Sequence, residues 1–539
     1  MPLLDQIRTQ NLIRLAAARF DATLTEAELK VMRESAASID PPEPVTGSPR
    51  PVVRSEFVRW LATDPDAASN IDPKGLRIWG ASLPCKIDFE ECHKLPTLYF
   101  RGCTLASGIN LMEAETKGLY LTESDVVGPV QGDGITVRGP INFSGSTFSK
   151  EVSLLGASIA HEFSCVGTKF NCSEDALSLD DAEIASNVLF NDGFQSCGTI
   201  RLLGVRIAGS IECQNSKFIT NGIALTLDGA RIEGDVFFRK GTTSSGEIRM
   251  PLAEISGDLE FCDVEMAEVY CRNLKVEGAF IWLLIRNPAN SKLKLIGARV
   301  RSLRDDRSSR PAQGNLQLDG LEYDDLMSYK DLNAEDVAKN RFPSEHELSA
   351  TDRVKWLKLQ DAENQTKPQP WMQLRDLLER KGDDAGAKHV LYKLRCLQAR
   401  KSWFLWRWWK IAFAWLDEAP QRILWSIAVT LFLGTLIFTR ASATGALAPT
   451  DKEAYSAFVS GNPIPVAYPV LNPFIYTLEN SLPLVKLGQD DKWAPDRRHP
   501  ATDWLTNYWF LMWTRWALIL FGWFQATVLA AALSDRLKL

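Results

Sequence analysis

The side chains that most often carry out chemistry in proteins are present in this sequence, but they are not grouped. The ten cysteines contain no Cys-x-x-Cys pair, and Cys85 and Cys92 are too far apart for a zinc knuckle. The five histidines are scattered, which predicts no metal cluster. There is no P-loop, no Gly-x-Ser-x-Gly elbow and no glycine-rich dinucleotide loop after a strand. The sequence therefore predicts a protein that is not an enzyme and that binds no cofactor or metal.

Acidic residues do recur at regular places, and the simplest interpretation is that they are solvated turns. They are Asp180, Asp181, Asp228, Asp235 and Asp258. A polysaccharide lyase would group such acids on one face of a β-helix, and a DNA mimic would need an unbroken acidic surface. Arginines such as Arg201, Arg206 and Arg231 interrupt that surface. The net charge of −6 shows no basic signature, so no nucleic-acid partner is expected.

The most suggestive polar segment is 472–495, because it lies between two apolar runs that are long enough to cross a membrane. The first span is predicted at 422–440 and the second at 509–533. Arg515, the one charge in the second run, lies near its start and can reach the interface, or it can be a buried functional arginine. Before the first span, 402–415 combines aromatic and basic residues and suits the headgroup layer. Its interfacial residues are Trp403, Trp406, Arg407, Trp408, Trp409 and Lys410.

The distribution of residues around these spans predicts their orientation. Thirteen of the 17 tryptophans lie at or beyond Trp371, which indicates a C-terminal region in a different solvent. Basic residues precede the first span and follow the second, so the positive-inside rule places both termini in the cytoplasm. The N-terminus has no basic start followed by an apolar run, which predicts that the N-terminal part stays in the cytoplasm. The expected location is a bacterial inner membrane.

The order of span, loop and span resembles the two-helix pore module of potassium-channel-like proteins. The resemblance implies a pore helix at Phe474–Leu482, with Phe474, Thr477, Glu479 and Ser481 as its candidate residues, and a tetramer around one conduit. It also implies a filter formed by Leu484, Val485, Lys486, Leu487, Gly488, Gln489, Asp490 and Asp491. The Thr-Val-Gly-Tyr-Gly pattern is missing, and Gly488 and the following acid are what remains of it. The alternative is an interfacial loop in a plain membrane anchor.

A six-residue phrase, which reads Leu-Leu-Gly-Ala-Ser-Ile at Leu154–Ile159, recurs with variations through the first two-thirds of the chain. It begins at Leu154, Leu179, Leu202, Leu227, Met250, Cys271, Leu295 and Leu318, with steps of 21 to 25 residues. Weaker copies begin at Ile78, Phe100 and Leu121, and the longer step from Leu121 to Leu154 predicts an insertion around Val130 to Ile141.

Each phrase is followed by two apolar residues two positions apart, which is the spacing of one strand face. The pairs are Phe163/Cys165, Val188/Phe190, Ile211/Cys213, Val236/Phe238, Leu259/Phe261 and Phe280/Trp282. A repeat of roughly 23 residues with such strands fits one coil of a parallel β-helix.

This region resembles pentapeptide-repeat proteins and, at Ile232–Val236, bactofilin-like solenoids. The shared feature is a small residue two places before an apolar centre, as in Ala157 before Ile159 and Ala230 before Ile232. The resemblance implies a right-handed parallel β-helix, although the next centre falls four residues on rather than five.

The predicted fold is mainly β: a right-handed parallel β-helix solenoid with helical caps, plus an α-helical two-span membrane domain. The expected domains are a helical cap (1–72), the β-helix (73–325), a helical linker hairpin (326–400) and the membrane domain (401–539). Ile13, Ala16, Ala17 and Phe20 mark one face of a cap helix, and Trp371, Leu374, Leu377 and Leu378 mark one face of a linker helix. Residues 38–51 are rich in Pro and Ser and read as a loop.

Two functions are in line with this organisation. The first is an oligomeric pore or channel-like protein in the bilayer whose cytosolic β-helix senses or scaffolds a protein partner, for which a bacterial stress or phage-defence setting is compatible. Two spans per chain cannot enclose a conduit, so this function requires a homo-oligomer. The second is a non-conducting, membrane-anchored scaffold whose long regular surface binds other proteins.

Overall fold

The computed structural model describes residues 3–20, 24–37, 50–329, 345–346, 349–400, 407, 410–411, 422–482, 486–500 and 503–537, with the backbone alone at 345–346 and 531–537. The chain divides into two compact units, Met1–Val390 and Leu391–Leu539.

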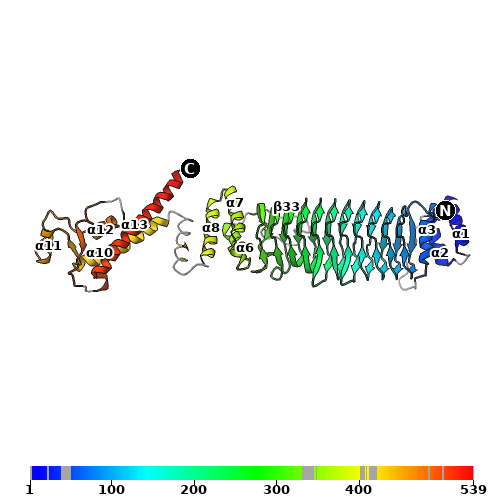
Figure 1. Ribbon diagram of the computed structural model, residues 1–539, viewed down its shortest axis with the longest axis horizontal. Helices are drawn as coiled ribbons and strands as arrows, with labels where there is room; N and C mark the ends of the chain where they lie inside the picture. Colours follow the sequence, from blue (N-terminus) through cyan, green and yellow to red (C-terminus); the bar gives the residue numbers. More distant parts are fainter. Residues whose placement is uncertain are drawn as a thin grey trace. The chain divides into compact units, whose positions relative to one another are not determined.

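The first unit is a parallel β-solenoid of about 11 turns (Figure 1). One coil contains four short strands, for example β15 (Ser158–Ile159), β16 (Phe163–Ser164), β17 (Lys169–Phe170) and β18 (Asp175–Ser178). Strands at equivalent places pair in parallel along two long sheets, of 20 and 18 strands. The first coil begins with β1 (Leu76–Trp79), and the last ends with β37 (Glu322–Tyr329). The prediction of a parallel β-helix is confirmed.

Apolar side chains stack inside the coils because successive strand residues point to opposite faces. All twelve residues of the predicted pairs, from Phe163 to Trp282, are at most 2% exposed. Their rings form ladders along the axis: Phe148 stacks on Phe170 with centroids 5.0 Å apart, and Phe238 on Phe261 at 4.8 Å. The predicted inward face of these strands is confirmed.

The glycine of the repeated phrase forms a corner of the coil. At this corner the backbone takes a positive φ between 52° and 77° in eleven successive coils. The residues are Glu91, Glu113, Gly134, Gly156, Asp181, Gly204, Gly229, Leu252, Asn273, Gly297 and Gly320. Glycine takes this conformation at no steric cost, and Asp and Asn tolerate it, which explains the residues found at eight of these eleven corners. Glu91, Glu113 and Leu252 take the same conformation without that advantage.

The predicted insertion around Val130 to Ile141 is wrong, because this segment forms an ordinary coil. Val130 of β10 (Val130–Gln131) pairs with both Ile109 and Val152, and Ile141 of β12 (Ile141–Asn142) pairs with both Leu119 and Phe163. The step from Leu121 to Leu154 is long because these two residues occupy different positions within their coils. The register shows that the Phe100–Leu121 ladder continues at Phe143.

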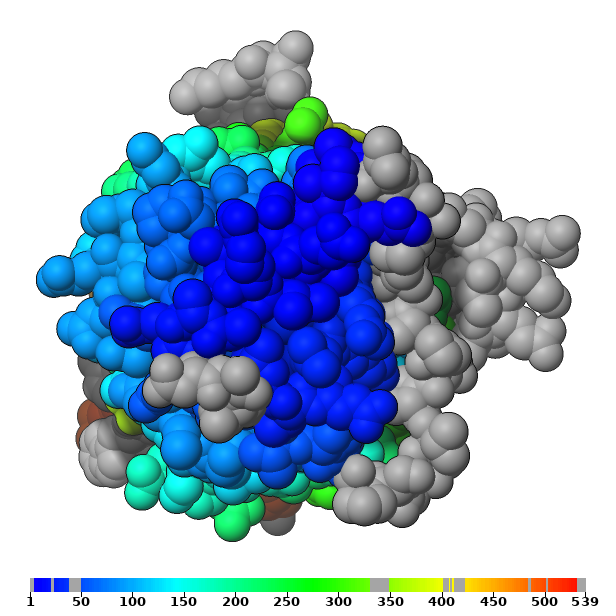
Figure 2. Space-filling view, turned by 90° about the vertical axis from the view of Figure 1, so that its right-hand side faces the viewer, coloured from blue at the N-terminus to red at the C-terminus, as the bar shows by residue number. Residues whose placement is uncertain are grey.

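Four helices cover the first coil: α1 (Leu3–Arg19), α2 (Glu26–Ala37), α3 (Ser55–Thr63) and α4 (Pro65–Ser69) (Figure 2). The edge of the coil is satisfied by hydrogen bonds from this segment. Val53 N donates to Ser82 O at 2.9 Å, and Ser35 Oγ accepts from Arg77 N at 3.1 Å. Covering an exposed sheet edge in this way prevents further strand addition. The predicted loop 38–51 lies outside the described residues except at its end.

The last coil is covered by α6 (Ala350–Leu357), the 3₁₀ turn η1 (Asn364–Thr366) and α7 (Pro368–Arg380), and β38 (Glu345–His346) pairs antiparallel with β37. The next helix, α8 (Asp384–Ala399), starts beside α6, where a Cβ atom on Gly386 would lie 2.9 Å from Ala350 Cβ. The predicted face of α7 is confirmed, since its four residues are 9% exposed or less. Glutamine side chains donate the hydrogen bonds that the backbone of a further coil would otherwise donate. Gln369 Nε2 donates to Leu321 O at 2.9 Å, and Gln373 Nε2 donates to Tyr323 O at 2.7 Å.

A buried ion pair joins this cap to the solenoid. Arg353 is 2% exposed and lies 2.9 Å from the Asp305 carboxylate, while its other nitrogen donates to Met327 O at 3.0 Å. Arg310 contacts the same carboxylate at 3.2 Å. Burial lowers the pKa of the Arg310 guanidinium, against the attraction of Asp305.

The second unit contains α10 (Arg422–Ala443), α11 (Lys452–Val459), α12 (Pro473–Ser481), the 3₁₀ turn η2 (Trp504–Thr506) and α13 (Tyr508–Leu537). Two short strands, β39 (Leu447–Pro449) and β40 (Trp493–Pro495), pair antiparallel after α10 and before α13. Among the described residues, α10 alone is long and apolar enough to be a candidate membrane span. The predicted second span lies within α13, where side chains are described as far as Ala530.

Candidate functional site

The short helix α12 occupies the place expected for a pore helix, and its sequence explains where it begins. Asn472 is its N-cap, with its side-chain oxygen accepting from Phe474 N at 3.1 Å and Ile475 N at 3.2 Å. Pro473 follows at the first helical position, where its missing N–H is no loss.

Two glycines seat α12 between the long helices. A Cβ atom on Gly434 of α10 would lie 2.5 Å from Thr477 Cγ2, and one on Gly522 of α13 would overlap the Ser481 carbonyl oxygen. Gly434 is nine residues before the end of α10, about 13 Å along the helix, and Gly522 is fourteen residues into α13, about 21 Å. The middle of α12 therefore packs near the middle of α10, and the C-terminal end of α12 packs near the middle of α13.

The returning chain is held by one carboxylate. Glu479 is 6% exposed and accepts four consecutive backbone N–H groups, from Leu487 (2.7 Å), Gly488 (2.9 Å), Gln489 (2.6 Å) and Asp490 (3.0 Å). Hydrogen bonds donated to a carboxylate favour its charged form, and a carboxylate can accept all four of them because its two oxygens offer about four lone-pair sites. Glu479 therefore holds the backbone of residues 487–490 against α12.

Arg515 of α13 ties the same loop to α12. Its Nε donates to Asn480 Oδ1 at 2.9 Å, and a terminal nitrogen donates to the Asp490 carbonyl at 2.9 Å. The guanidinium lies 5.8 Å from the centroid of the Tyr476 ring. These contacts place the Arg515 guanidinium against α12 and the loop that follows it.

Gln489 connects the return of the loop to its start. It is 6% exposed, its Oε1 accepts from Asn472 N at 3.1 Å, and its Nε2 donates to Val470 O at 3.1 Å. Helix α12 and the loop that follows it are called the hairpin from here on. Gln489 ties the loop to the residues just before α12, and Glu479 and Arg515 tie it to α12 itself.

Polar side chains also join the two long helices directly, beyond the C-terminal end of α12. Gln525 of α13 is 1% exposed, and its Nε2 donates to Ser426 Oγ at 2.8 Å and Thr430 Oγ1 at 3.0 Å on α10. In an apolar surrounding such hydrogen bonds specify how two helices pack.

The candidates from the sequence fall into three groups. Thr477, Glu479, Ser481 and Gln489 are buried, Asp490 and Arg515 are half-buried, and Phe474, Lys486, Leu487, Gly488 and Asp491 are exposed. Leu484, Val485, Trp403, Trp406, Trp408 and Trp409 lie outside the described residues. Arg407 and Lys410 are exposed helical residues.

Several residues of the site were missed at the level of sequence. Tyr476 and Asn480 carry no distinctive signal, whereas Gly434, Gly522 and Gln525 do. They are small or polar residues inside apolar runs, which is a known signature of close helix packing in membranes. The Asn472-Pro473 pair is also a recognisable helix start.

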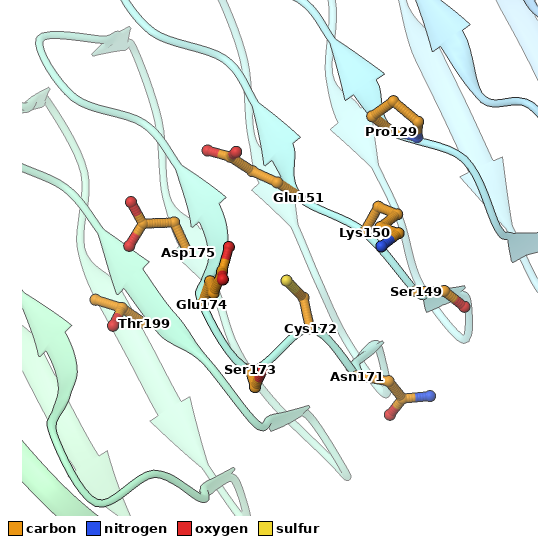
Figure 3. Close-up of a pocket in the computed structure, with 10 residues that line it drawn as sticks. All are labelled: Pro129, Ser149, Lys150, Glu151, Asn171, Cys172, Ser173, Glu174, Asp175 and Thr199. Atoms are coloured by element: carbon orange, nitrogen blue, oxygen red, sulfur yellow. The ribbon is translucent and has the colours of Figure 1, made fainter.

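The solenoid has a polar groove of about 860 Å³ along coils near residues 149–175 (Figure 3). Glu151, Glu174 and Asp175 line it, together with Lys150 and Cys172. Asp175 is already paired with Arg201 at 3.0 Å, and Glu151 accepts from Ser178 Oγ at 3.0 Å. Across the described residues no group of three or more His, Cys, Asp or Glu side chains is placed to hold a metal ion.

In comparisons with protein-family models, curated proteins and solved structures, no family, relative or structure matches this chain.

Proposed function

We propose that this chain is a homo-oligomeric, channel-like membrane protein in which the hairpin of α12 and the following loop lines a conduit. The observation that carries the proposal is the depth of α12, whose last residue, Ser481, packs on Gly522 near the middle of α13. Non-helical backbone at membrane depth is tolerated where it is buried in protein or lines a water-filled cavity. The loop after Ser481 meets this condition on one side, where Glu479 and Arg515 bind it.

The membrane arrangement follows from this proposal. The helices α10 and α13 are the two spans, and both termini face the cytoplasm of a bacterial inner membrane by the positive-inside rule. One copy presents one hairpin, so several copies are needed to surround a conduit. Four copies are expected if the module follows potassium-channel-like proteins. The return segment, residues 484–491, is the candidate selectivity region.

The solenoid is the cytosolic part of the proposed protein and offers a surface for a protein partner. We take it as right-handed and pentapeptide-repeat-like, in line with the hand of nearly all parallel β crossovers. On the outer face of its first coils, β1, β4 (Leu98–Arg101) and β8 (Leu119–Thr122) form a groove of about 450 Å³. Tyr99 stacks on Tyr120 with centroids 4.3 Å apart, and Arg101 lies over Trp79 at 5.4 Å. Aromatic and arginine side chains of this kind dominate binding energy at protein interfaces.

The test is ion flux from liposomes that contain the purified full-length chain. The unmodified chain should form an oligomer in detergent and conduct ions. Replacing the exposed Lys486, Leu487 and Asp491 with Ser keeps Gln489 and the backbone donors to Glu479 and removes side chains of the proposed conduit, so it should abolish or alter the flux. The control replaces Glu453, an exposed residue of α11, with Gln.

The second candidate is a non-conducting, membrane-anchored scaffold, which the groove at Tyr99 and Tyr120 favours. A chain that remains monomeric and gives no flux would contradict the channel and leave the scaffold. If the chain conducts, the pair of substitutions Tyr99→Ser and Tyr120→Ser should leave flux unchanged, because the groove belongs to the first unit and the proposed conduit to the second.

A further inference from the structure

An apolar pocket of about 400 Å³ lies beside the strands β39 and β40, outside the hairpin. Its walls include Ser442, Leu447, Phe458, Ile464, Tyr468 and Trp493. Leu447 and Trp493 are 1% and 5% exposed, and the Trp493 indole N–H is satisfied by Pro469 O at 3.0 Å. These two side chains therefore form a buried floor, and the volume of the pocket lies within the range of ligand pockets.

Two of the residues that line this pocket, Val466 and Val470, are highly exposed apolar side chains. Val466 has a relative exposure of 104% and Val470 of 85%, and Val459 on the neighbouring helix α11 is 62% exposed. An exposed apolar patch that borders an apolar pocket marks a membrane or protein contact.

The pocket lies at the level where the long helices leave the proposed bilayer, so the inference rests on the proposed function in this respect. Ser442 belongs to the last turn of α10, and two residues earlier Arg440 pairs with Asp503 at 3.2 Å. Trp504 and Trp509, which follow Asp503, are 70% and 57% exposed. Exposed tryptophans of this kind lie at the membrane–water boundary.

A cation stands at the polar edge of the pocket. Lys492 Nζ lies 6.0 Å from the centroid of the Tyr468 ring, which lines the pocket. Lys492 is exposed and forms no ion pair within the part of the chain that the structure describes. We propose that the pocket holds an acyl chain of an anionic phospholipid from the outer leaflet, whose phosphate is bound by Lys492.

A phospholipid satisfies both features of the pocket together. Its acyl chain covers Val466 and Val470, and its phosphate supplies the counter-charge for Lys492. A second copy of the chain in the same place would bury the valines but is not required to bring an anion to Lys492. The two occupants therefore differ in their dependence on lipid charge.

The experiment uses the full-length chain in nanodiscs of phosphatidylglycerol and phosphatidylcholine, with p-benzoylphenylalanine in place of Val466. Illumination should give a phospholipid adduct, measured by intact mass, that is enriched about fivefold in phosphatidylglycerol over its share of the bilayer. The control places the same photoreactive residue at Glu453, which should give little lipid adduct. Lys492→Gln should leave the total adduct at position 466 and reduce the enrichment to none.

Each other outcome overturns the proposal. A cross-link to a second copy assigns the pocket to the oligomer, and equal lipid adducts at positions 453 and 466 show unspecific proximity to the membrane. Enrichment that survives Lys492→Gln removes the phosphate from that residue. Flux measured on the unmodified chain separates the two proposals: a specific lipid adduct without flux rejects the channel and keeps the lipid site.

Discussion

In the solenoid, backbone N–H groups donate one by one to carbonyl groups of the neighbouring coils, whereas in the hairpin four consecutive N–H groups donate to the single side chain of Glu479. The first arrangement is distributed, so each coil needs its two neighbours and no particular side chain. The second is concentrated, because one carboxylate replaces a whole strand partner. The comparison teaches that substitutions should have small, local effects in the solenoid and large effects in the hairpin.

The glycines of the two regions differ in the same way. Gly156 at a solenoid corner has φ +62° and no atom within 4 Å of an added Cβ, so its conformation matters and its size does not. Gly522 is helical, and its size matters because Ser481 packs directly on it. Equivalent coils carry Asp181 and Asn273 at the corner, which shows that the solenoid accepts alternatives.

The largest effect is expected for Gly522→Ala. The added methyl group overlaps the Ser481 carbonyl oxygen, so α12 has to move away from α13 and the hairpin loses its seat. We expect flux to fall to background while the chain still enters the membrane, measured in liposomes. The control is Ala517→Leu on an exposed face of α13, which should conduct. Full flux from Gly522→Ala would show that α12 does not pack there.

The next effect is expected for Glu479→Gln. The carboxamide offers one acceptor oxygen in place of two, so about two of the four N–H groups lose a charge-assisted bond worth roughly 1.5–3 kcal/mol each. Flux should fall strongly, because the loop loses part of its attachment to α12. Glu453→Gln is the matched control. Retained flux would mean that the loop does not depend on this carboxylate.

Within the first unit, the largest effect is expected for Arg353→Met at the C-terminal cap. It leaves the Asp305 carboxylate, which is 3% exposed, with Arg310 as its remaining partner. Breaking a buried pair in this way costs about 3–5 kcal/mol, measured by denaturant unfolding of the chain. Asp305→Leu should cost at least as much, because it leaves the buried Arg353 and Arg310 guanidinium groups without their shared carboxylate. A single-variant loss below about 1 kcal/mol, well under the range for a broken buried pair, would show that the cap does not depend on it.

The solenoid could be predicted from the sequence because its signal is repeated. Phe163 and Cys165 are unremarkable alone, but the same spacing in successive coils fixes both the strand face and the period. The prediction failed at Leu121, where two apolar ladders of similar composition were joined into one. The hairpin occurs once in the chain, so no repetition supports it. Its helix is marked by Asn472 and Pro473, but the contact of Glu479 with residues eight to eleven positions on depends on a fold that local patterns do not encode.

A smaller effect is expected for Gly156→Ala. Alanine in a left-handed conformation costs roughly 1–2 kcal/mol. Gly156→Asn should cost less, because Asn273 occupies the same corner with φ +53°. The measurement is the free energy of unfolding of both variants. Equal losses for Ala and Asn would show that space, rather than conformation, selects glycine at this corner.

The smallest effect is expected for Arg206→Gln on the outer face of the solenoid. Arg206 pairs with Glu183 of the preceding coil at 2.6 Å, but the two side chains are 63% and 60% exposed. A pair this open to solvent contributes about 0.5 kcal/mol or less, because water screens the attraction and the long side chains lose freedom on pairing. The backbone bonds from Arg206 N to Ala182 O and from Ala208 N to Ile184 O do not involve the side chain and remain.

The free energy of unfolding of Arg206→Gln should therefore be nearly the same as that of the unmodified chain, measured by denaturant unfolding. A loss of about 2 kcal/mol or more would lie well above the range for exposed ion pairs. It would mean that ion pairs between coils stabilise the solenoid in addition to the backbone hydrogen bonds. The solenoid would then depend on particular side chains, as the hairpin depends on Glu479, and the contrast between the two regions would no longer stand.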